Sequence, residues 1–289
     1  MKPAPFRYER PTTVAEAVAV LATGDDDREV KVLAGGQSLV PLLALRLTRP
    51  ATLVDLNHIN ELRGIEVRGD QVRIGAMTRY EVLRTDEVVR RRVPLLAVAA
   101  GHIGHRAIRT RGTIGGSLAH ADPAAELPTA CLALGAAVDV VRPDESRTIP
   151  ISMLFDGPFG TTLAPDELVV SVRVPVDTGR RPFGFAELAR RPGDFALVLS
   201  AVTIATDADG GCRAATVAVG GVGGHARLVG PAARALIGTR LANGAIDAAV
   251  AEVDRAIAPF DDLHASAEYR RAMAALMVRR AIEAARGAR

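Results

Sequence analysis

The chain has 289 residues, 48% of them hydrophobic, which is enough material for a sizeable core and for two or three compact units. Its 36 basic and 33 acidic residues leave a net charge of only +3, and aromatic residues make up 3% with no tryptophan, so stacking platforms for nucleic acid are not expected. No apolar run reaches membrane length and the first residues lack an apolar signal region, so we expect a cytoplasmic protein without a transmembrane segment.

The N-terminal segment is predicted to begin with a helix. Residues 12–24 repeat apolar side chains at helical spacing, Thr13 and Glu16 have the spacing of a capping box, and Gly24 supplies a stop. Residues 29–36 then follow the pattern of a strand that ends in a glycine loop.

The next segment mixes strands and helices. Residues 51–57 form a second short strand, and residues 64–76 alternate apolar and polar side chains around a turn, as a hairpin does. A second capping-box spacing, Thr78 to Glu81, predicts the start of a long helical stretch that is interrupted at Pro94.

The middle and the end of the chain differ in pattern. Residues 120–135 indicate a loop that leads into a helix, and three strand-like runs follow at 136–141, 147–151 and 167–175. After Pro175 we expect a separate unit with three antiparallel strands, the last two joined by a glycine turn, and three closing helices. The strands are at 183–191, 196–207 and 212–222, and the helices at 231–238, 245–258 and 266–287.

Three glycine clusters stand out, at residues 34–38, 113–117 and 220–226. A single glycine pair is more often a turn with positive φ than a ligand site. The third cluster contains G-x-G-x-x-A, but Pro231 interrupts the helix that a dinucleotide-binding Rossmann motif requires, so an NAD enzyme is the weakest reading.

The first two clusters suggest a shared role. Each pairs two glycines with hydroxyl or amide side chains, and neither is followed by the Gly-Lys-Ser/Thr of a P-loop. Backbone N–H groups in such loops form anion-binding nests, to which Ser38, Thr113 and Ser117 could add hydroxyl donors. Two loops that converge could therefore hold one pyrophosphate.

Other candidate residues carry weaker signals. His102 and His105 have H-x-x-H spacing, but no third metal ligand lies nearby in the sequence. The two cysteines belong to no C-x-x-C pair, so neither a metal centre in this chain nor a disulfide framework is predicted. The arginines that precede the second glycine cluster either raise the local potential or form a solvated strip; they are Arg106, Arg109 and Arg111.

Three stretches together carry a family resemblance: LAGGQSLVPLLALRL, IRTRGTIGGSLAHADPAAELP and ELARRPGDFALV. In this order they resemble the FAD-binding medium subunit of the molybdenum hydroxylases, the family of xanthine dehydrogenase and aerobic carbon monoxide dehydrogenase. The resemblance spans the whole chain. It implies an α+β protein with a two-subdomain FAD-binding fold of the vanillyl-alcohol oxidase type, at 1–55 and 56–175, and a C-terminal domain at 176–289.

The resemblance also implies which residues hold FAD. The two glycine segments would cradle the pyrophosphate, Ile103 would lie against the isoalloxazine, and Glu126 would reach polar atoms of the cofactor, with further residues lining the ring. The full set is Leu33, Ala34, Gly35, Gly36, Gln37, Ser38, Leu39, Val40, Ile103, Thr113, Ile114, Gly115, Gly116, Ser117, His120, Asp122, Glu126, Leu168, Val169, Ala186 and Phe195.

Three positions depart from relatives. Gln37 stands where the carbon monoxide enzymes have histidine, Phe195 stands where many relatives have tyrosine, and Ala186 stands where some have lysine. A phenyl ring still packs on a flavin but lacks the phenolic hydrogen bond. His120, Asp122 and Glu126 have an alternative role in shaping their proline-containing loop.

The implied function is electron transfer. A small subunit with two [2Fe-2S] clusters and a large molybdopterin subunit would be partners, in a dimer of heterotrimers, and FAD in this chain would pass electrons to an external acceptor. No side-chain nucleophile or base is required for this role. A stand-alone FAD-dependent reductase of the same fold, and a non-catalytic interaction domain with a degenerate flavin site, are the alternatives.

Overall fold

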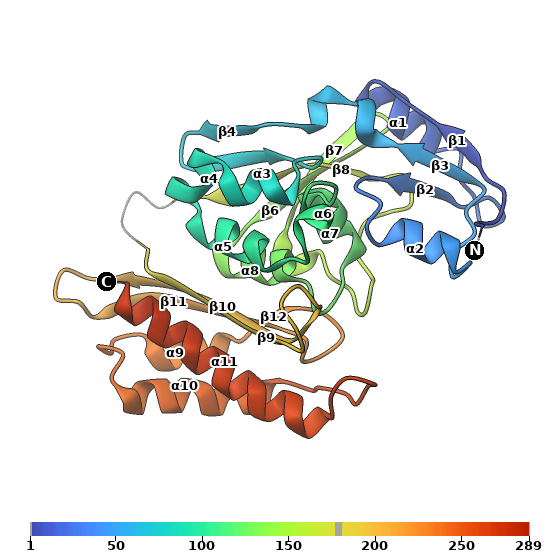
Figure 1. The fold of residues 1–289 in the computed structure, drawn as a ribbon. Helices are drawn as coiled ribbons and strands as arrows, with labels where there is room; N and C mark the ends of the chain where they lie inside the picture. The colour runs from blue at the N-terminus through green and yellow to red at the C-terminus, as the bar shows by residue number, and fades with distance from the viewer. Residues whose placement is uncertain (1, 177–180, 289) are drawn as a thin grey trace.

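The computed structural model describes residues 2–176 and 181–288. Three sheets follow one another along the chain, and Figure 1 shows the first at one end of the molecule and the third, with its helices, along the lower side. No helix in the described part of the chain is both long and apolar enough to cross a membrane.

The first sheet is parallel. Its three strands lie in the order β1 (Arg7–Glu9), β3 (Thr52–Asp55), β2 (Val30–Leu33). Parallel neighbours need a crossover, which α1 (Val14–Leu21) and α2 (Leu39–Ala44) supply. Because β2 and β3 run parallel, the loops that follow them leave the sheet on the same side.

The predicted capping box at the start of α1 is confirmed in part. The Thr13 hydroxyl accepts a hydrogen bond from the Glu16 amide at 3.1 Å, as expected. The Glu16 carboxylate, however, accepts from the amide and the hydroxyl of Thr12 rather than from the Thr13 amide. The cap is thus shared between two threonines.

The second sheet is antiparallel and has five strands in the order β4-β5-β8-β6-β7. The predicted hairpin and the later strands are confirmed. The strands are β4 (Ile65–Arg68), β5 (Gln71–Gly75), β6 (Ala137–Arg142), β7 (Glu145–Pro150) and β8 (Leu168–Pro175).

Helices precede or interrupt this sheet in the chain. They are the 3-10 turns η1 (Leu56–His58), η2 (Asn60–Leu62) and η3 (Ile151–Met153), and the helices α3 (Tyr80–Thr85), α4 (Glu87–Arg92), α5 (Pro94–His102), α6 (Arg106–Arg109), α7 (Ile114–His120) and α8 (Glu126–Leu134).

The second capping-box prediction was wrong. Arg79, not Thr78, precedes α3, and no side chain caps that helix. The Glu81 carboxylate pairs instead with Arg84 and Arg109, at 2.6 and 3.0 Å. Two arginines offer this carboxylate charge-assisted bonds, which are stronger than a bond to a neutral amide.

The third sheet forms the C-terminal domain and is antiparallel, in the order β12-β11-β10-β9. The prediction of three strands was one short, because Arg227 and Leu228, which follow the third glycine cluster, pair with β11 as a fourth strand. The elements are β9 (Phe183–Ala189), β10 (Ala196–Thr206), β11 (Cys212–Gly220), β12 (Arg227–Leu228), α9 (Gly230–Leu236), α10 (Asn243–Ala256) and α11 (Ala267–Gly287). Antiparallel pairing excludes the Rossmann reading of residues 220–226.

The C-terminal sheet is covered on both faces. Helices α9, α10 and α11 pack on one face and form a core with it, while α5 and α8 of the preceding domain lie against the other (Figure 1). One apolar core includes residues of both domains, among them Leu127, Ala130, Ala201 and Ala218. The C-terminal domain is therefore built onto the middle one through buried side chains.

Candidate functional site

The first two glycine clusters lie against each other, as the sequence suggested. We call residues 34–38 together with 111–117 the glycine junction. A Cβ atom on Gly35 would lie 2.3 Å from the carbonyl oxygen of Arg111 and 2.7 Å from Cα of Gly112. Two main chains are in direct contact there, so only glycine fits at position 35.

The first segment of the junction is a tight turn. Gly36 has a φ of +73°, a conformation that strains residues with a side chain. The side-chain amide of Gln37 donates to the Gly35 carbonyl at 3.1 Å, so it braces the turn from within. Ser38 precedes α2 without capping it, which leaves its hydroxyl available to a ligand.

The second segment is the first turn of a helix rather than the predicted loop. Thr113 caps α7, and its hydroxyl accepts from the Gly116 amide at 3.2 Å. Gly115 packs against Ala76, the residue that follows β5, because a Cβ there would lie 2.6 Å from Cβ of Ala76. Gly116 faces the first segment, where a Cβ would lie 3.4 Å from Cβ of Ala34.

A polar bridge that the sequence analysis missed ties the two segments together. Asn57 donates to the Ala34 carbonyl at 3.0 Å and accepts from Arg79 at 2.5 Å. Arg79 also donates to the Arg111 carbonyl. Asn57 and Arg79 belong to no recognisable motif. The one signal in the sequence that could have identified them is their position, just after the strand β3 and just before the helix α3.

Asp55 stands behind this bridge. Burial raises the pKa of its carboxyl, but hydrogen bonds from Tyr8 and Asn57 outweigh burial and lower it. Burial, with Arg63 and Arg111 nearby, lowers the pKa of Arg79. Hydrogen bonds within the fold therefore fix the side chains of both Asp55 and Arg79.

One of the three arginines before α7 has a structural role. Arg109 pairs with Glu81 and donates to the carbonyls of Ile103 and Gly104 at 3.1 and 2.9 Å. The charge of Arg109 is thus neutralised by Glu81, so Arg109 neither raises the local potential nor forms part of a solvated strip, as the sequence had suggested. Arg106 and Arg111 are exposed and keep that reading.

A second group of predicted residues lies where the middle and C-terminal domains meet. Glu126 is the first residue of α8 and is 6% exposed. Burial, with the nearby Glu187 carboxyl, raises the pKa of Glu126 to about 8. Burial also raises the pKa of Tyr80 to about 12, against the effect of a hydrogen bond with Ser117. Tyr80 thus links the glycine junction to Glu126.

Strand β9 presents alternate residues to the two domains. Phe183 and Phe185 pack against the core of the middle domain, whereas Ala186 and Leu188 pack against the C-terminal core. The side chain of Ala186, predicted to line the flavin, therefore points toward the C-terminal helices. Because side chains alternate along a strand, Glu187 lies on the face that Phe183 and Phe185 share, toward the middle core.

The remaining predicted apolar residues divide between two cores. Leu168 and Ala34 pack in the core beneath the first sheet, while Val169, the next residue on β8, packs in the middle core. Ile103 ends α5 and is half-buried against the middle core. Leu33, Leu39 and Val40 flank the first segment of the glycine junction in the sequence, and Val40 is 53% exposed. Ile114 lies within the second segment and is fully buried in the middle core.

His120, Asp122 and Phe195 surround the site less closely. The His120 ring lies 5.1 Å from that of Phe159, and burial lowers its pKa. The Asp122 carboxylate accepts from the Ala124 amide at 2.9 Å, which supports its role in shaping the loop. Phe195 is 73% exposed, so in this structure its ring is available to a ligand or partner.

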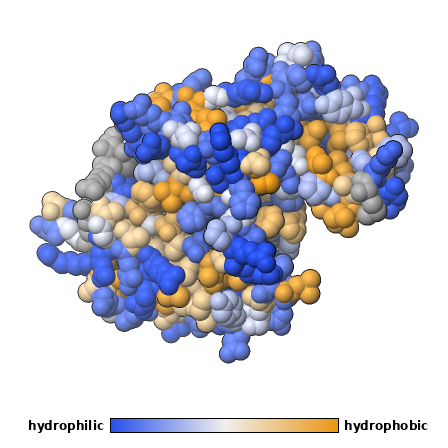
Figure 2. Space-filling view, viewed as in Figure 1, coloured by the Kyte–Doolittle hydropathy of each residue, from blue (hydrophilic) through white to orange (hydrophobic). Residues whose placement is uncertain are grey.

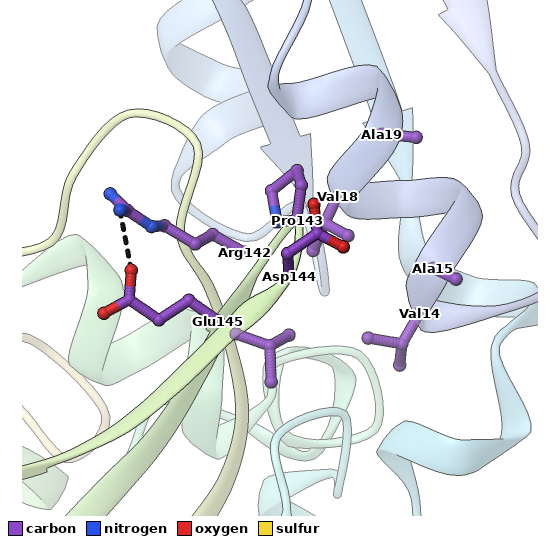
Figure 3. A pocket seen from close by; sticks show the side chains of 9 residues that line it. Val14, Ala15, Val18, Ala19, Arg142, Pro143, Asp144 and Glu145 are labelled. Carbon is purple, nitrogen blue, oxygen red and sulfur yellow. Dashed lines mark ion pairs between the residues drawn. The ribbon is translucent and has the colours of Figure 1, made fainter.

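A surface pocket of about 410 Å³ lies elsewhere, between α1 and the turn that joins β6 and β7 (Figure 3). Val14 and Val18 form one wall, and an ion pair of 2.6 Å between Arg142 and Glu145 borders it. None of the predicted cofactor residues lines this pocket, so it is no part of the candidate site.

Comparisons with known proteins agree with this geometry. Two family models match in order: the FAD binding domain in molybdopterin dehydrogenase, over residues 4–177, and the CO dehydrogenase flavoprotein C-terminal domain, over residues 183–285. The nicotine 6-hydroxylase medium subunit of Paenarthrobacter nicotinovorans is 39% identical over 98% of each chain. The carbon monoxide dehydrogenase medium chain of Afipia carboxidovorans is 36% identical over 99% of this chain and 98% of that one.

Solved structures that resemble this chain come from the same kinds of enzyme. A chain of carbon monoxide dehydrogenase from Oligotropha carboxidovorans matches with a TM-score of 0.96 and 35% identity over 100% of both chains. A chain of quinoline 2-oxidoreductase from Pseudomonas putida 86 matches with a TM-score of 0.93 and 36% identity, over 100% of this chain and 99% of that one. The chain therefore belongs to the FAD-binding medium subunits of the molybdenum hydroxylases, a family of oxidoreductases.

Proposed function

We propose that this chain binds FAD at the glycine junction and passes electrons from the [2Fe-2S] clusters of a small subunit to an external acceptor. The observation that carries the proposal is the contact between Gly35 and the backbone of Arg111 and Gly112. Such a contact brings two sets of main-chain amides together where a pyrophosphate can approach them. The absence of side chains on Gly35, Gly36 and Gly116 leaves that approach open.

The residues present fit the cofactor. The pyrophosphate would be held by residues 33–40 and 113–117, with hydroxyl donors from Ser38 and Ser117. The ring would extend toward Ile103, Glu126 and the 168–169 segment. His120, Asp122, Ala186 and Phe195 stay in the proposed set, and the face of β9 opposite the Ala186 side chain adds Phe185 and Glu187.

FAD supplies the redox chemistry, because it can take up electrons singly and give them up in pairs. The chain's own role is to bind the cofactor, orient it and set the polarity around the ring. Partners of the proposed complex are the small iron–sulfur subunit and a large molybdopterin subunit, in a dimer of heterotrimers. The relatives' description as medium subunits or medium chains supports this arrangement.

An exposed apolar surface on and after α2 supports a subunit contact. Val40, Leu45 and Leu47 are 53%, 58% and 71% exposed. Figure 2 shows apolar side chains gathered at the end of the molecule where Figure 1 draws α2. Exposed apolar patches mark interaction sites more often than free surface.

The finer organisation follows the same proposal. We propose FAD-binding subdomains at 1–55 and 56–175, of the vanillyl-alcohol oxidase type, and a C-terminal domain at 176–289, supported by the three separate sheets.

Purification of the tagged chain from its source organism tests the function. We expect one FAD per chain together with iron, sulfide and molybdenum from two co-purifying subunits. A yellow protein that elutes alone and reduces its own substrate would favour the stand-alone reductase. A colourless protein that takes up no FAD would favour the interaction domain.

A further inference from the structure

The carboxyl of Glu187 is buried without a hydrogen-bond partner. Its side chain is 6% exposed, and Oε2 finds no donor or acceptor within the part of the chain that the structure describes. Burying an unpaired polar group costs free energy, and a charged one costs more, so this group is neutral or is paired when a ligand is bound. No structural role of Glu187 accounts for that cost.

His102 connects Glu187 to solvent. Its Nδ1 lies 3.7 Å from Oε2 of Glu187, and its ring lies 4.9 Å from that of Phe185, which fixes its direction. The His102 side chain is 44% exposed, whereas the carboxylate end of Glu187 is not. His102 is also followed by Ile103, the residue proposed to lie against the flavin.

Few charged groups face this pair. Glu126, at the start of α8, lies near enough to Glu187 for the two carboxyls to repel each other, and Asp122 acts on Glu126 from the preceding loop. His102 comes from α5. The partner of Glu187 on β10 is Leu199, and α11 packs on the opposite face of β9, against Ala186 and Leu188. We call Glu187, His102 and Glu126 the carboxyl cluster.

We propose that Glu187 and His102 form a proton-binding pair that serves the flavin, with Glu187 holding a proton beside Glu126 and His102 exchanging it with solvent. The inference rests on the proposed FAD site, because Glu126 is the carboxyl expected to reach polar atoms of the cofactor. Burial raises the pKa of Glu187 to about 7 and lowers that of His102, which suits exchange of a proton near neutral pH.

The proton balance is simple. If FAD bound here took up two electrons from the iron–sulfur clusters of the partner, the O–H of Glu126 would supply the proton for the N–H bond formed on the ring, and the O–H of Glu187 would replace that proton on Glu126. The carboxylate left behind is reprotonated from solvent by way of the His102 ring. Oxidation by the external acceptor reverses both transfers. Glu187 is thus a positioning residue that acts through Glu126.

Infrared titration of the full chain without FAD tests the pair directly. The wild-type protein should show two protonated carboxyl signals, one from Glu187 that disappears as pH rises through about 7 and one from Glu126 that disappears through about 8. Glu187→Gln should lack the first signal and keep the second, and Glu61→Gln, a change at an exposed carboxyl with no partner in the described structure, should retain both. Wild-type protein without the first signal, or Glu187→Gln with both signals unchanged, overturns the proposal.

Reductive titration of the FAD-loaded chain with dithionite tests the link to the flavin. The pH at which the slope of midpoint potential against pH changes should be the same in the wild type and in Glu61→Gln, and should be shifted in Glu187→Gln. His102→Gln should retain the potential but slow proton uptake by roughly tenfold or more. Identical pH profiles in all proteins overturn the inference while FAD binding stands; failure of every protein to bind FAD instead overturns the proposed function.

Discussion

The glycine junction and the carboxyl cluster are built in opposite ways. The junction is made by main chains in contact, with Gly35 against Arg111 and Gly112, and its polar bridge fixes backbone carbonyls. The carboxyl cluster is made by three side chains from α5, α8 and β9, and one of its oxygens has no partner. In the first region the bridging side chains are hydrogen-bonded to backbone carbonyls, whereas the second keeps an unsatisfied carboxyl oxygen.

We expect the two regions to have different roles. In the proposed function the junction holds the pyrophosphate, and a side chain at Gly35 would force its two segments apart. Buried acids cost stability, so we expect Glu126 and Glu187 to act in the chemistry of the bound cofactor. Changes in the two regions should therefore have different consequences.

The largest effect is expected at the junction. Gly35→Val places a side chain 2.3 Å from the Arg111 carbonyl, so the two segments must separate and FAD binding should be lost. Fluorescence titration with FAD measures this. Gly101→Ala is the control, because its Cβ would meet only Arg84, at 3.8 Å, within a helix, and FAD affinity should not change. Equal loss in both variants would contradict the assignment.

Glu126→Gln should change the pH dependence of stability by a few kcal/mol at most. The folded pKa of about 8 lies above the ordinary 4.5, so the folded protein binds more protons between these values and the wild type loses stability as pH rises through that window. The variant lacks this loss. Urea unfolding at pH 5 and pH 8 measures it; parallel curves for both proteins would show that Glu126 ionises normally.

Asn57→Ala removes the bridge between the segments. The lost bonds to Ala34 and Arg79 should cost about 1–3 kcal/mol of stability and weaken FAD binding. Thermal unfolding and FAD titration provide the two measurements. Asn60→Ala, at an exposed position three residues away, should change neither. If FAD affinity is unaffected while stability falls, the bridge supports the fold and not the cradle.

Gln37→Ala should have the smallest effect. Its single bond to the Gly35 carbonyl is worth about 1 kcal/mol, so FAD affinity should fall several-fold at most. Gln37→His keeps a side-chain N–H donor at this position and should recover part of the affinity. A complete loss of FAD in Gln37→Ala would mean that this side chain contacts the cofactor directly.

The junction could be predicted from sequence because its requirements are local. Gly35 and Gly116 mark positions where a side chain does not fit, and the pattern around them is visible within five residues. The second segment was expected to be a loop, but it is the first turn of α7. Thr113 has an extended backbone conformation and its hydroxyl accepts from the Gly116 amide, which stabilises the start of the helix.

The carboxyl cluster could not be predicted in the same way. Ala186 was expected at the flavin, yet strand alternation turns it toward the C-terminal helices and turns Glu187 inward. Which face of β9 meets α5 and α8 depends on how two domains pack, which no single segment specifies. Asn57 and Arg79 were missed for the same reason, since their partners lie 22 to 32 residues away.

The relative affinity of the chain for FAD and for riboflavin tests the central claim most directly. Riboflavin carries the same ring but no pyrophosphate, so if the glycine junction holds the pyrophosphate, FAD should bind at least a hundredfold more tightly, a difference of about 2.7 kcal/mol. Gly35→Val should abolish that difference. Equal affinity of the wild-type chain for the two ligands would show that the junction does not bind the pyrophosphate.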